Sequence, residues 1–318
     1  MAFKVLIPQD IAEEGKKYLR ERGYEIKMGS GITVEAIRED VKDCDAILAR
    51  TAPFPGEVLR AGKRLKVVAR HGVGIDNIDV KTATELGIYV TNAPESNANS
   101  VAEHTVGLIV ALAKGYLRFD REFRSGNFEI RNQLKGQDLE GKTLGIIGVG
   151  RIGRLVAKKA LKGFDMRVLG YDPYVTGVEE LPELEVVTDW ETPFRESDFI
   201  TLHLPATADT RGIIGKKELG IMKSTAYLIN AARGEIVNEE ELIRALREKK
   251  IAGAGLDVFE KEPPEKNNPL LKMENVIATP HNAALTAECS IRMALHAAMG
   301  IDDVLSGRKP RWPVNIPV

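Results

Sequence analysis

Three short segments of the sequence carry polar side chains suited to proton transfer and anion binding. They are centred on Arg233, Glu262 and His281, and each follows an apolar run typical of a buried strand. A histidine titrates near neutral pH, so it can both give and take a proton. A carboxylate beside it favours the charged imidazolium, and an arginine can bind a carboxylate through two parallel hydrogen bonds. Together these residue types suit chemistry at a carbonyl that lies next to an acid group.

Taken singly, each of these residues has a plainer explanation. His281 would serve as a hydrogen-bonded histidine at a strand end, Arg233 as a surface charge, and Glu262 as one of several charges in a loop. The catalytic interpretation therefore requires all three side chains to converge in space.

A glycine-rich turn predicts a dinucleotide site. The run Gly148-Val149-Gly150-Arg151-Ile152-Gly153 follows an apolar stretch and precedes a helix predicted for residues 154–161. In such a turn the first glycine permits the bend, the second lets a pyrophosphate approach the backbone, and the third lets the helix pack on the sheet. The helix N-terminus then offers its N–H groups to the phosphates.

Asp172 strengthens this prediction. It ends the next predicted strand, about 20 residues beyond the glycines, where an acidic side chain binds the ribose hydroxyls of NAD. Its charge would repel the 2′-phosphate of NADP, and neither Pro173 nor Tyr174 supplies a compensating cation. The sequence therefore predicts NAD as the cofactor.

The elements that must position these residues form an α/β pattern. Apolar runs without polar alternation are separated by amphipathic stretches, which is typical of parallel sheets covered on both faces. We predict helices over residues 11–22, 33–41 and 238–249. The predicted strands are residues 5–7, 46–48, 67–69, 88–90, 144–147, 168–171, 199–202, 227–229, 254–258 and 276–278.

One long helix is predicted to be apolar nearly all round. Ser100 followed by Glu103 forms a capping-box pattern, and an apolar stretch then runs from Val101 to Ala113. Such a helix must be buried on several sides. It is either a central core helix or a helix packed against a second subunit, and the sequence favours neither.

Composition narrows the class of protein. At 318 residues the chain predicts two domains, and its net charge of −1, from 45 basic and 46 acidic residues, argues against nucleic acid or an anionic membrane as partner. Two cysteines, Cys44 and Cys289, imply no disulfide framework and fit a reducing cytoplasm. Pro8 interrupts the first apolar run, so no signal peptide is expected, and no run approaches the roughly 18 residues of a membrane span. We predict no metal site.

In this order, these motifs closely resemble the D-isomer-specific 2-hydroxyacid dehydrogenases, nearest to their phosphoglycerate dehydrogenase and hydroxypyruvate reductase branch. The resemblance covers about residues 46 to 281 and depends on four segments besides the glycine turn. These segments are residues 70–77, 230–234, 257–264 and 279–281. It implies hydride transfer between NAD and a 2-hydroxy or 2-keto acid, with Arg233, Glu262 and His281 as the catalytic set.

The resemblance also implies binding residues. The loop 70–77 would hold the substrate carboxylate through backbone amides, and Asp257 would hold the nicotinamide carboxamide. Asn282 and Ala283 depart from the family's commoner apolar–glycine pair after the histidine. The residues predicted to bind the cofactor are Gly148, Gly150, Arg151, Ile152, Gly153, Asp172, Leu204, Pro205, Ala231, Asp257 and Ala283. Those predicted to bind the substrate are Arg50, Arg70, Val73, Gly74 and Asn97.

The family's architecture is discontinuous. It implies a flavodoxin-like substrate domain of residues 1–97 and 290–318 and a Rossmann domain of residues 98–289. From the apolar helix 101–113 we predict a homodimer built around it. Since the sequence stops at Val318, we do not expect the regulatory domain of longer phosphoglycerate dehydrogenases.

The substrate stays open at this point. Arg50 and Arg70 end predicted strands and Arg131 lies in a polar loop, and three arginines suggest a phosphate and hence 3-phosphoglycerate. Each of them would equally make a surface salt bridge, and hydroxypyruvate or glyoxylate needs none of them. Two other functions occur on this fold, NAD-sensing corepressors and formate oxidation. The first needs extended binding surfaces and the second added segments, neither of which the sequence contains.

Overall fold

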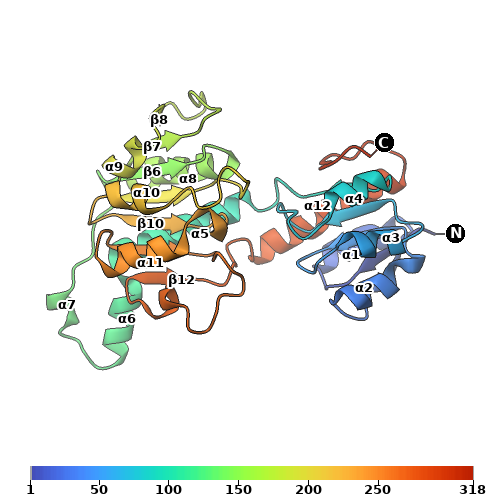
Figure 1. Cartoon of the computed structure of the whole chain (residues 1–318), viewed down its shortest axis with the longest axis horizontal. Coiled ribbons are helices and arrows are strands. Elements are labelled where there is room, and N and C mark those ends of the chain that lie inside the picture. Colours follow the sequence, from blue (N-terminus) through green and yellow to red (C-terminus); the bar gives the residue numbers. More distant parts are fainter. Residues whose placement is uncertain (1, 318) are drawn as a thin grey trace. The chain divides into compact units, whose positions relative to one another are not determined.

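In a computed structural model that describes residues 2–317, the chain divides into two compact units (Figure 1). The first unit comprises Met1–Ala98 and Ala284–Val318, and the second is Asn99–Ala283. The chain thus returns to the first unit several residues before the expected position of 290. The reason is that the last helix, α12 (Ala287–Leu305), packs along its length on strands of the first unit.

The first unit is built on a five-stranded parallel sheet of order β2-β1-β3-β4-β5, the flavodoxin-like order. Its strands are β1 (Lys4–Ile7), β2 (Glu25–Met28), β3 (Ala46–Ala49), β4 (Val67–Arg70) and β5 (Tyr89–Thr91). Its helices besides α12 are α1 (Glu13–Glu21), α2 (Val34–Asp40), the 3₁₀ turn η1 (Val41–Asp43), α3 (Gly56–Ala61) and α4 (Val80–Glu85).

Both faces of this sheet are buried, which explains the continuous apolar strands. Val5 and Ile7 pack in one cluster with residues of α1 and α12, whereas Leu6 between them packs in the opposite cluster with residues of α2 and α3. Successive residues of a strand point to opposite faces, so each strand needs apolar side chains at every position.

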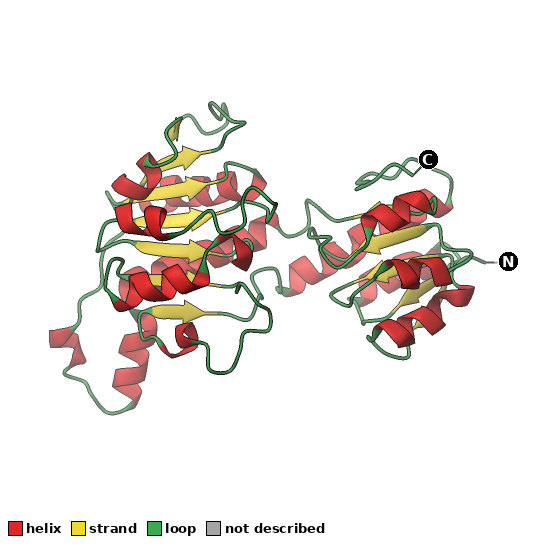
Figure 2. Cartoon of the chain, in the orientation of Figure 1, coloured by secondary structure: helices red, strands yellow, loops and turns green. Residues whose placement is uncertain are grey.

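The second unit holds a seven-stranded parallel sheet of order β12-β11-β10-β9-β6-β7-β8, which is the Rossmann order with one added strand. Its strands are β6 (Thr143–Ile147), β7 (Arg167–Tyr171), β8 (Leu184–Val187), β9 (Phe199–Leu202), β10 (Tyr227–Asn230), β11 (Gly253–Leu256) and β12 (Val276–Ala278). Its helices are α5 (Ala98–Lys114), α6 (Tyr116–Arg124), α7 (Ile130–Gln133), α8 (Arg151–Phe164), α9 (Thr192–Glu196), α10 (Lys216–Ile221) and α11 (Glu239–Arg247), with 3₁₀ turns η2 (Gly234–Ile236) and η3 (Pro269–Lys272). Helices again cover both faces of the sheet (Figure 2).

The prediction of two doubly wound parallel sheets is confirmed, but it missed one edge strand in each sheet. In β2 and β8 polar residues such as Glu25, Lys27 and Glu185 interrupt the apolar residues. An edge strand is only half covered, so it lacks the continuous apolar run that marked the central strands.

The predicted capping box at Ser100 is wrong. Helix α5 begins at Ala98, which puts Ser100 inside the first turn. Glu103 instead accepts a hydrogen bond from Asn99 Nδ2 at 2.7 Å and pairs with Lys159 at 3.5 Å. The helix therefore starts before the pattern that suggested its start.

Helix α5 is a core helix on one face and only partly covered on the other. Leu108 and Leu112 contact the backbone of Gly255 in β11, and both are buried. Gly107 and Val110 lie on the less covered side. The two alternatives left open by the sequence are therefore compatible, since one face fills the core and another stays accessible.

Within residues 2–317, no helix combines the length and the apolar character that crossing a membrane requires.

Candidate active site

The three predicted catalytic segments follow neighbouring strands of the second unit. β10 pairs with β11, and β11 with β12, all in parallel. The carboxyl ends of these strands therefore lie at the same edge of the sheet, where open α/β sheets bind ligands. Arg233, Glu262 and His281 each stand in the loop that leaves one of these strands.

His281 and Glu262 form a close pair. The imidazole Nδ1 lies 2.7 Å from Glu262 Oε2, and Glu262 Oε1 accepts a hydrogen bond from the backbone N–H of Phe259 at 3.1 Å. The side chains are 51% and 37% exposed, so solutes can reach them. Because Nδ1 is engaged by the carboxylate, Nε2 is the ring nitrogen that can exchange a proton with a ligand.

The surroundings favour the charged forms of both groups. The hydrogen bond to Glu262 raises the pKa of His281 above its ordinary value of 6.5, against partial burial and the nearby charge of Arg233, while the charges of Glu262 and Asp257 raise it further. Partial burial raises the pKa of Glu262, but the hydrogen bond and charge of His281 outweigh this and lower it overall. The pair therefore favours a proton on the histidine and a negative charge on the carboxylate.

Asp257 fixes the turn that presents His281. This residue is buried, and its backbone carbonyl accepts from the His281 N–H at 2.8 Å. Its carboxylate oxygens accept from the next two amides, of Asn282 and Ala283, each at 2.9 Å. Three successive amides are thus held by one residue, which maintains His281 in the left-handed region at φ 50°.

Thr279 and His104 had no predicted role, yet both join this network. Thr279 Oγ1 donates to Asp257 Oδ1 at 2.6 Å, and His104 Nε2 lies 3.2 Å from the same hydroxyl. His104 comes from α5, far away in sequence, and only the packing of α5 against β11 and β12 brings it here. Sequence spacing carries no signal for such a contact.

Arg233 is positioned by its own loop. Asn230 Nδ2 donates to the Arg233 carbonyl at 2.9 Å, and Arg233 Nη1 donates to the Ala232 carbonyl at 2.8 Å. The next residue, Gly234, touches the backbone of Phe259, where a Cβ atom would lie only 1.9 Å from the carbonyl carbon. The Arg233 and Glu262 loops are therefore in direct backbone contact, and the charge of Arg233 acts on both Glu262 and His281.

The glycine-rich turn fits a dinucleotide. Gly148 has φ 98° and lies against the His203 carbonyl, and a Cβ on Gly153 would lie 2.1 Å from the Gly148 carbonyl oxygen. A Cβ on Gly150 would meet nothing within 4 Å, which leaves room for a pyrophosphate. Gly150 is also the N-cap of α8 and offers no side-chain acceptor, so the first amides of this helix can bind phosphate oxygens.

Asp172 follows β7 at the position expected for a ribose-binding acid. Its Oδ2 accepts from the Val149 N–H and its Oδ1 from the Tyr174 N–H, both at 2.9 Å. Each oxygen keeps a further lone pair for a ribose hydroxyl. The acid is thus fixed beside the glycine turn.

The other predicted cofactor residues lie on loops at the same edge. Leu204 and Pro205 follow β9, and Leu204 lies against Gly148. Ala231 follows β10, and Ala283 closes the turn held by Asp257. Arg151 and Ile152 begin helix α8.

The predicted substrate residues lie in the first unit. Arg50 follows β3 and Arg70 ends β4, and these strands are paired with Ala49 opposite Arg70. Arg50 Nη1 donates to the Asp10 carbonyl at 2.5 Å, whereas Arg70 folds back onto the carbonyl of His71.

The loop after β4 is held by asparagines. Asn92 Nδ2 donates to the Val73 carbonyl at 2.9 Å, and Asn77 Nδ2 donates to the carbonyls of Arg50 and Ala52 at 2.9 and 2.6 Å. Gly74 lies within this loop, and the buried Oδ1 of Asn97 has no hydrogen-bond partner in the described part of the chain.

Arg131, the third arginine considered for a phosphate, lies apart from the strand ends. It lies on α7, at the side of the second unit away from the carboxyl ends of the strands (Figures 1 and 2). Its guanidinium stands 5.1 Å from the ring centre of Phe128. Only two of the three arginines considered for a phosphate therefore stand at the ends of strands.

No group of three or more His, Cys, Asp or Glu side chains within residues 2–317 is arranged to hold a metal ion.

Comparison with known proteins places this geometry in a family. Residues 106–283 match the family model described as "D-isomer specific 2-hydroxyacid dehydrogenase, NAD binding domain". The chain is 43% identical to D-3-phosphoglycerate dehydrogenase of Methanocaldococcus jannaschii over 99% of its own length, but spans only 60% of that protein. It is 40% identical to glyoxylate reductase of Korarchaeum cryptofilum, over 99% of this chain and 96% of that one.

Solved structures agree. A glyoxylate reductase from Paecilomyes thermophila superposes with a TM-score of 0.88 at 29% identity, over 98% of both chains. The predictions of the fold, of the family and of an NAD-binding domain are confirmed by these matches.

Proposed function

The chain belongs to the D-isomer-specific 2-hydroxyacid dehydrogenase family, and from this we propose that it is an NAD-dependent oxidoreductase acting on a D-2-hydroxy acid. The observation that carries the proposal is the convergence of Arg233, Glu262 and His281 at the strand edge that also bears the glycine turn and Asp172. The corepressor alternative predicts NAD binding without turnover, so consumption of NADH with any 2-keto acid excludes it.

The proposed mechanism assigns one task to each side chain. When bound, the dinucleotide supplies the hydride for the substrate carbon in reduction and accepts it in oxidation. His281 gives the proton on Nε2 to the substrate oxygen in reduction and takes it back in oxidation. Glu262 holds the ring through Nδ1 and stabilises the imidazolium. Arg233 binds the substrate carboxylate and polarises the carbonyl.

For the substrate we propose 3-phosphoglycerate first. Two cations, Arg50 and Arg70, stand at the carboxyl ends of paired strands. Burial, and next the charges of these two arginines, lower the pKa of His71 to about 4. A positive field at this loop favours a substrate with a second anionic group.

The second candidate is hydroxypyruvate or glyoxylate. It is favoured because Arg50 and Arg70 donate to backbone carbonyls, those of Asp10 and His71. It is also favoured by the position of Arg131 on α7, away from the carboxyl ends of the strands. These smaller keto acids need a single carboxylate contact, which Arg233 would supply.

A panel of keto acids distinguishes the candidates. We expect a higher kcat/KM with NADH for 3-phosphohydroxypyruvate than for hydroxypyruvate or glyoxylate, and Arg50→Ala to reduce it for the phosphorylated acid alone. Arg38→Ala serves as the matched control, because Arg38 pairs with Glu57 on the surface of the same unit. Equal losses for all three acids, or a preference for glyoxylate, would favour the second candidate.

We also propose a homodimer that uses the accessible side of α5 together with α6. Helix α6 and the segment after it expose Tyr116, Leu117, Phe123 and Phe128, each more than half exposed, and buried residues are absent from α6. A cluster of exposed aromatic residues on one segment suits a protein interface. Charge at Leu108 would disrupt the core instead, since that residue is buried against Gly255.

The solution mass tests this proposal. Phe123→Asp should produce a folded monomer, with unchanged far-ultraviolet circular dichroism, whereas Leu108→Asp should lower the thermal stability. A wild-type protein that is fully active as a monomer at micromolar concentration would contradict the dimer.

We further propose a cytoplasmic location, supported by Cys44 and Cys289, which are both buried and form no disulfide. Fractionation of source cells with an antibody to the chain tests it.

A further inference from the structure

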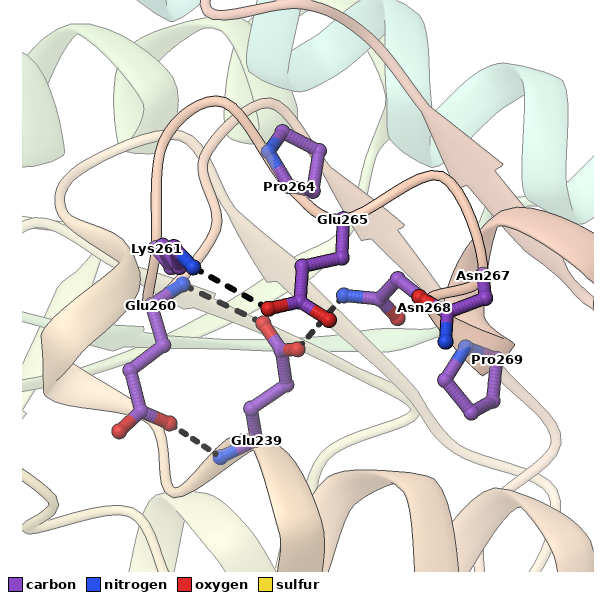
Figure 3. Close-up of a pocket in the computed structure, with 8 residues that line it drawn as sticks. All are labelled: Glu239, Glu260, Lys261, Pro264, Glu265, Asn267, Asn268 and Pro269. Carbon is purple, nitrogen blue, oxygen red and sulfur yellow. Dashed lines mark hydrogen bonds and ion pairs between the residues drawn. The ribbon is translucent and has the colours of Figure 1, made fainter.

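The loop that carries Glu262 is anchored at both ends by one side chain, that of Glu239. Glu239 is the first residue of α11, and its carboxylate Oε2 accepts the backbone N–H of Glu260 at 3.2 Å. Its Oε1 accepts from Asn268 Nδ2 at 2.7 Å. The carboxylate thus joins residue 260, before Glu262, to residue 268, after it (Figure 3).

The first of these contacts is reciprocal. The backbone N–H of Glu239 donates to Glu260 Oε2 at 3.2 Å, while the N–H of Glu260 donates to Glu239 Oε2. Two of the amides that helix α11 and the loop would otherwise leave to water are satisfied by this exchange. The contact also fixes the direction in which the chain leaves Phe259.

Few other contacts restrain the segment between these anchors. Phe259 is buried in the core, but residues 260–263 are exposed. Besides the pair with His281, the other contacts are the bond from the Phe259 N–H to Glu262 Oε1 at 3.1 Å, the surface ion pair Lys261–Glu265 at 3.1 Å, and the bond from the Asn268 N–H to the Glu265 carbonyl at 2.9 Å. An exposed ion pair contributes little to order, and the bond from Phe259 holds only the Glu262 side chain, so the course of the loop backbone depends on the anchors.

The carboxylates here do not form a ligand site. They line a surface pocket of about 500 Å³ with Pro264, Asn267 and Pro269, but each already accepts hydrogen bonds from the protein or pairs with a lysine. Their contacts instead connect the loop to helix α11.

We propose that Glu239 is a positioning residue of the active site, which keeps Glu262 within hydrogen-bond distance of His281 by tying both ends of the loop 260–268 to helix α11. The inference rests on the proposed function of Glu262 and His281. Three charged groups face His281, namely Glu262, Asp257 and Arg233. Of these, only Glu262 lies on the anchored segment. Loosening the anchor should therefore remove the influence of Glu262 and leave the other two in place.

The test is Glu239→Ala in the full-length protein. We expect kcat for keto-acid reduction to fall by about tenfold, less than the roughly hundredfold that a 1 Å misplacement can cost. The high-pH limb of the pH–rate profile should move to lower pH, which is the direction expected for Glu262→Gln. NMR of the His281 ring should show the same downward movement of its titration, without any dependence on activity. Glu239→Gln should give an intermediate result, because the two donors bind different oxygens and the amide replaces one of these oxygens with an NH2 group that can only donate.

Asn268→Asp provides a second test that preserves the local helix. Asn268 Oδ1 caps η3 by accepting from the Leu270 N–H at 2.9 Å, and an aspartate keeps that acceptor while losing the donor to Glu239. We expect Asn268→Asp to move the high-pH limb of the pH–rate profile to lower pH, as Glu239→Ala does. The double variant Glu239→Ala/Asn268→Asp should show no additional shift. Glu240→Ala is the matched control, since Glu240 is exposed and pairs only with Arg244 among the contacts described.

The outcomes separate the two proposals. If His281→Ala and Glu262→Gln act as proposed but Glu239→Ala lowers activity or thermal stability without moving the His281 titration, Glu239 has only a structural role. An unchanged kcat and titration in Glu239→Ala would also overturn the inference. If His281→Ala keeps wild-type activity, the proposed function itself fails.

Discussion

At the scale of single residues, the proposed proton transfer depends on the few contacts that orient His281. One carboxylate, that of Glu262, fixes the ring through Nδ1, and one residue, Asp257, fixes three successive amides of its turn. The backbone at His281 is in the left-handed region, which residues other than glycine rarely adopt, so the contacts with Asp257 must maintain it.

The first prediction concerns this pair. His281→Ala should lower kcat by about two to four orders of magnitude, the usual contribution of a positioned general acid–base. Reduction needs the protonated histidine, so activity falls as pH rises through the pKa of His281. Glu262 raises this pKa, and Glu262→Gln should therefore move the high-pH limb to lower pH. Steady-state profiles with NADH check both effects, and a limb that stays in place would contradict the assignment.

The second prediction concerns cofactor choice. Asp172 offers its remaining lone pairs to ribose hydroxyls and would repel a 2′-phosphate, so kcat/KM should be much higher with NADH than with NADPH. Asp172→Ala should narrow this ratio by removing both effects. The control is Asp189→Ala, because Asp189 lies in the same unit and contacts only surface residues among those described. Equal wild-type efficiency with both cofactors would refute the prediction.

At the scale of the elements, the site exists because strands β10, β11 and β12 are parallel neighbours. Their loops meet at one edge, and the close approach of Gly234 to Phe259 joins the Arg233 and Glu262 loops. Helix α11 contributes the anchor at Glu239, and α5 contributes His104.

The third prediction tests the contact between the loops. In Gly234→Ala the added Cβ would lie 1.9 Å from Phe259 backbone atoms, so the loops must separate. We expect a loss of about 1 to 3 kcal/mol in the free energy of unfolding. A fall in kcat should accompany it, because Arg233 and Glu262 move apart.

Gly220→Ala is the control for this variant, since a Cβ there meets nothing within 4 Å. Wild-type stability and activity in Gly234→Ala would show that the loops do not need this contact.

At the scale of the whole molecule, the buried histidine His71 makes the free energy of unfolding depend on pH. His71 is 6% exposed at the end of β4, and burial together with the charges of Arg50 and Arg70 lowers its pKa to about 4. At pH values between 6.5, the ordinary pKa of histidine, and about 4, His71 is mostly protonated in the unfolded chain and mostly neutral in the folded chain. Stability contributed by His71 is therefore lost as pH falls below that ordinary value.

The fourth prediction follows from this linkage. The free energy of unfolding should include a decrease of up to about 1.4 kcal/mol per pH unit over that range from His71 alone. His71→Asn should show a flatter dependence in urea unfolding followed by circular dichroism. An identical slope in the variant and the wild type would mean that His71 is not kept neutral by the fold.

The sequence by itself determined the features that are local or periodic. Continuous apolar strands identified both parallel sheets, because a strand covered on two faces needs apolar residues at every position. The glycine turn followed by Asp172 identified the dinucleotide site, since its function depends on consecutive backbone positions. The segments of Arg233, Glu262 and His281 were recognisable because each comes after an apolar strand, and the resemblance to the family pointed to these three residues as the catalytic set.

Only the tertiary structure decided the contacts between segments far apart in the chain. The edge strands β2 and β8 were missed because half-covered strands carry mixed residues. The start of α5 was misplaced because an i, i+3 pattern does not require a cap. The position of Arg131 on α7, the approach of His104 to Thr279, and the anchoring of the Glu262 loop by Glu239 leave no mark in sequence spacing. Side chains meet there because packed helices and parallel strands bring them together, and that information resides in the fold.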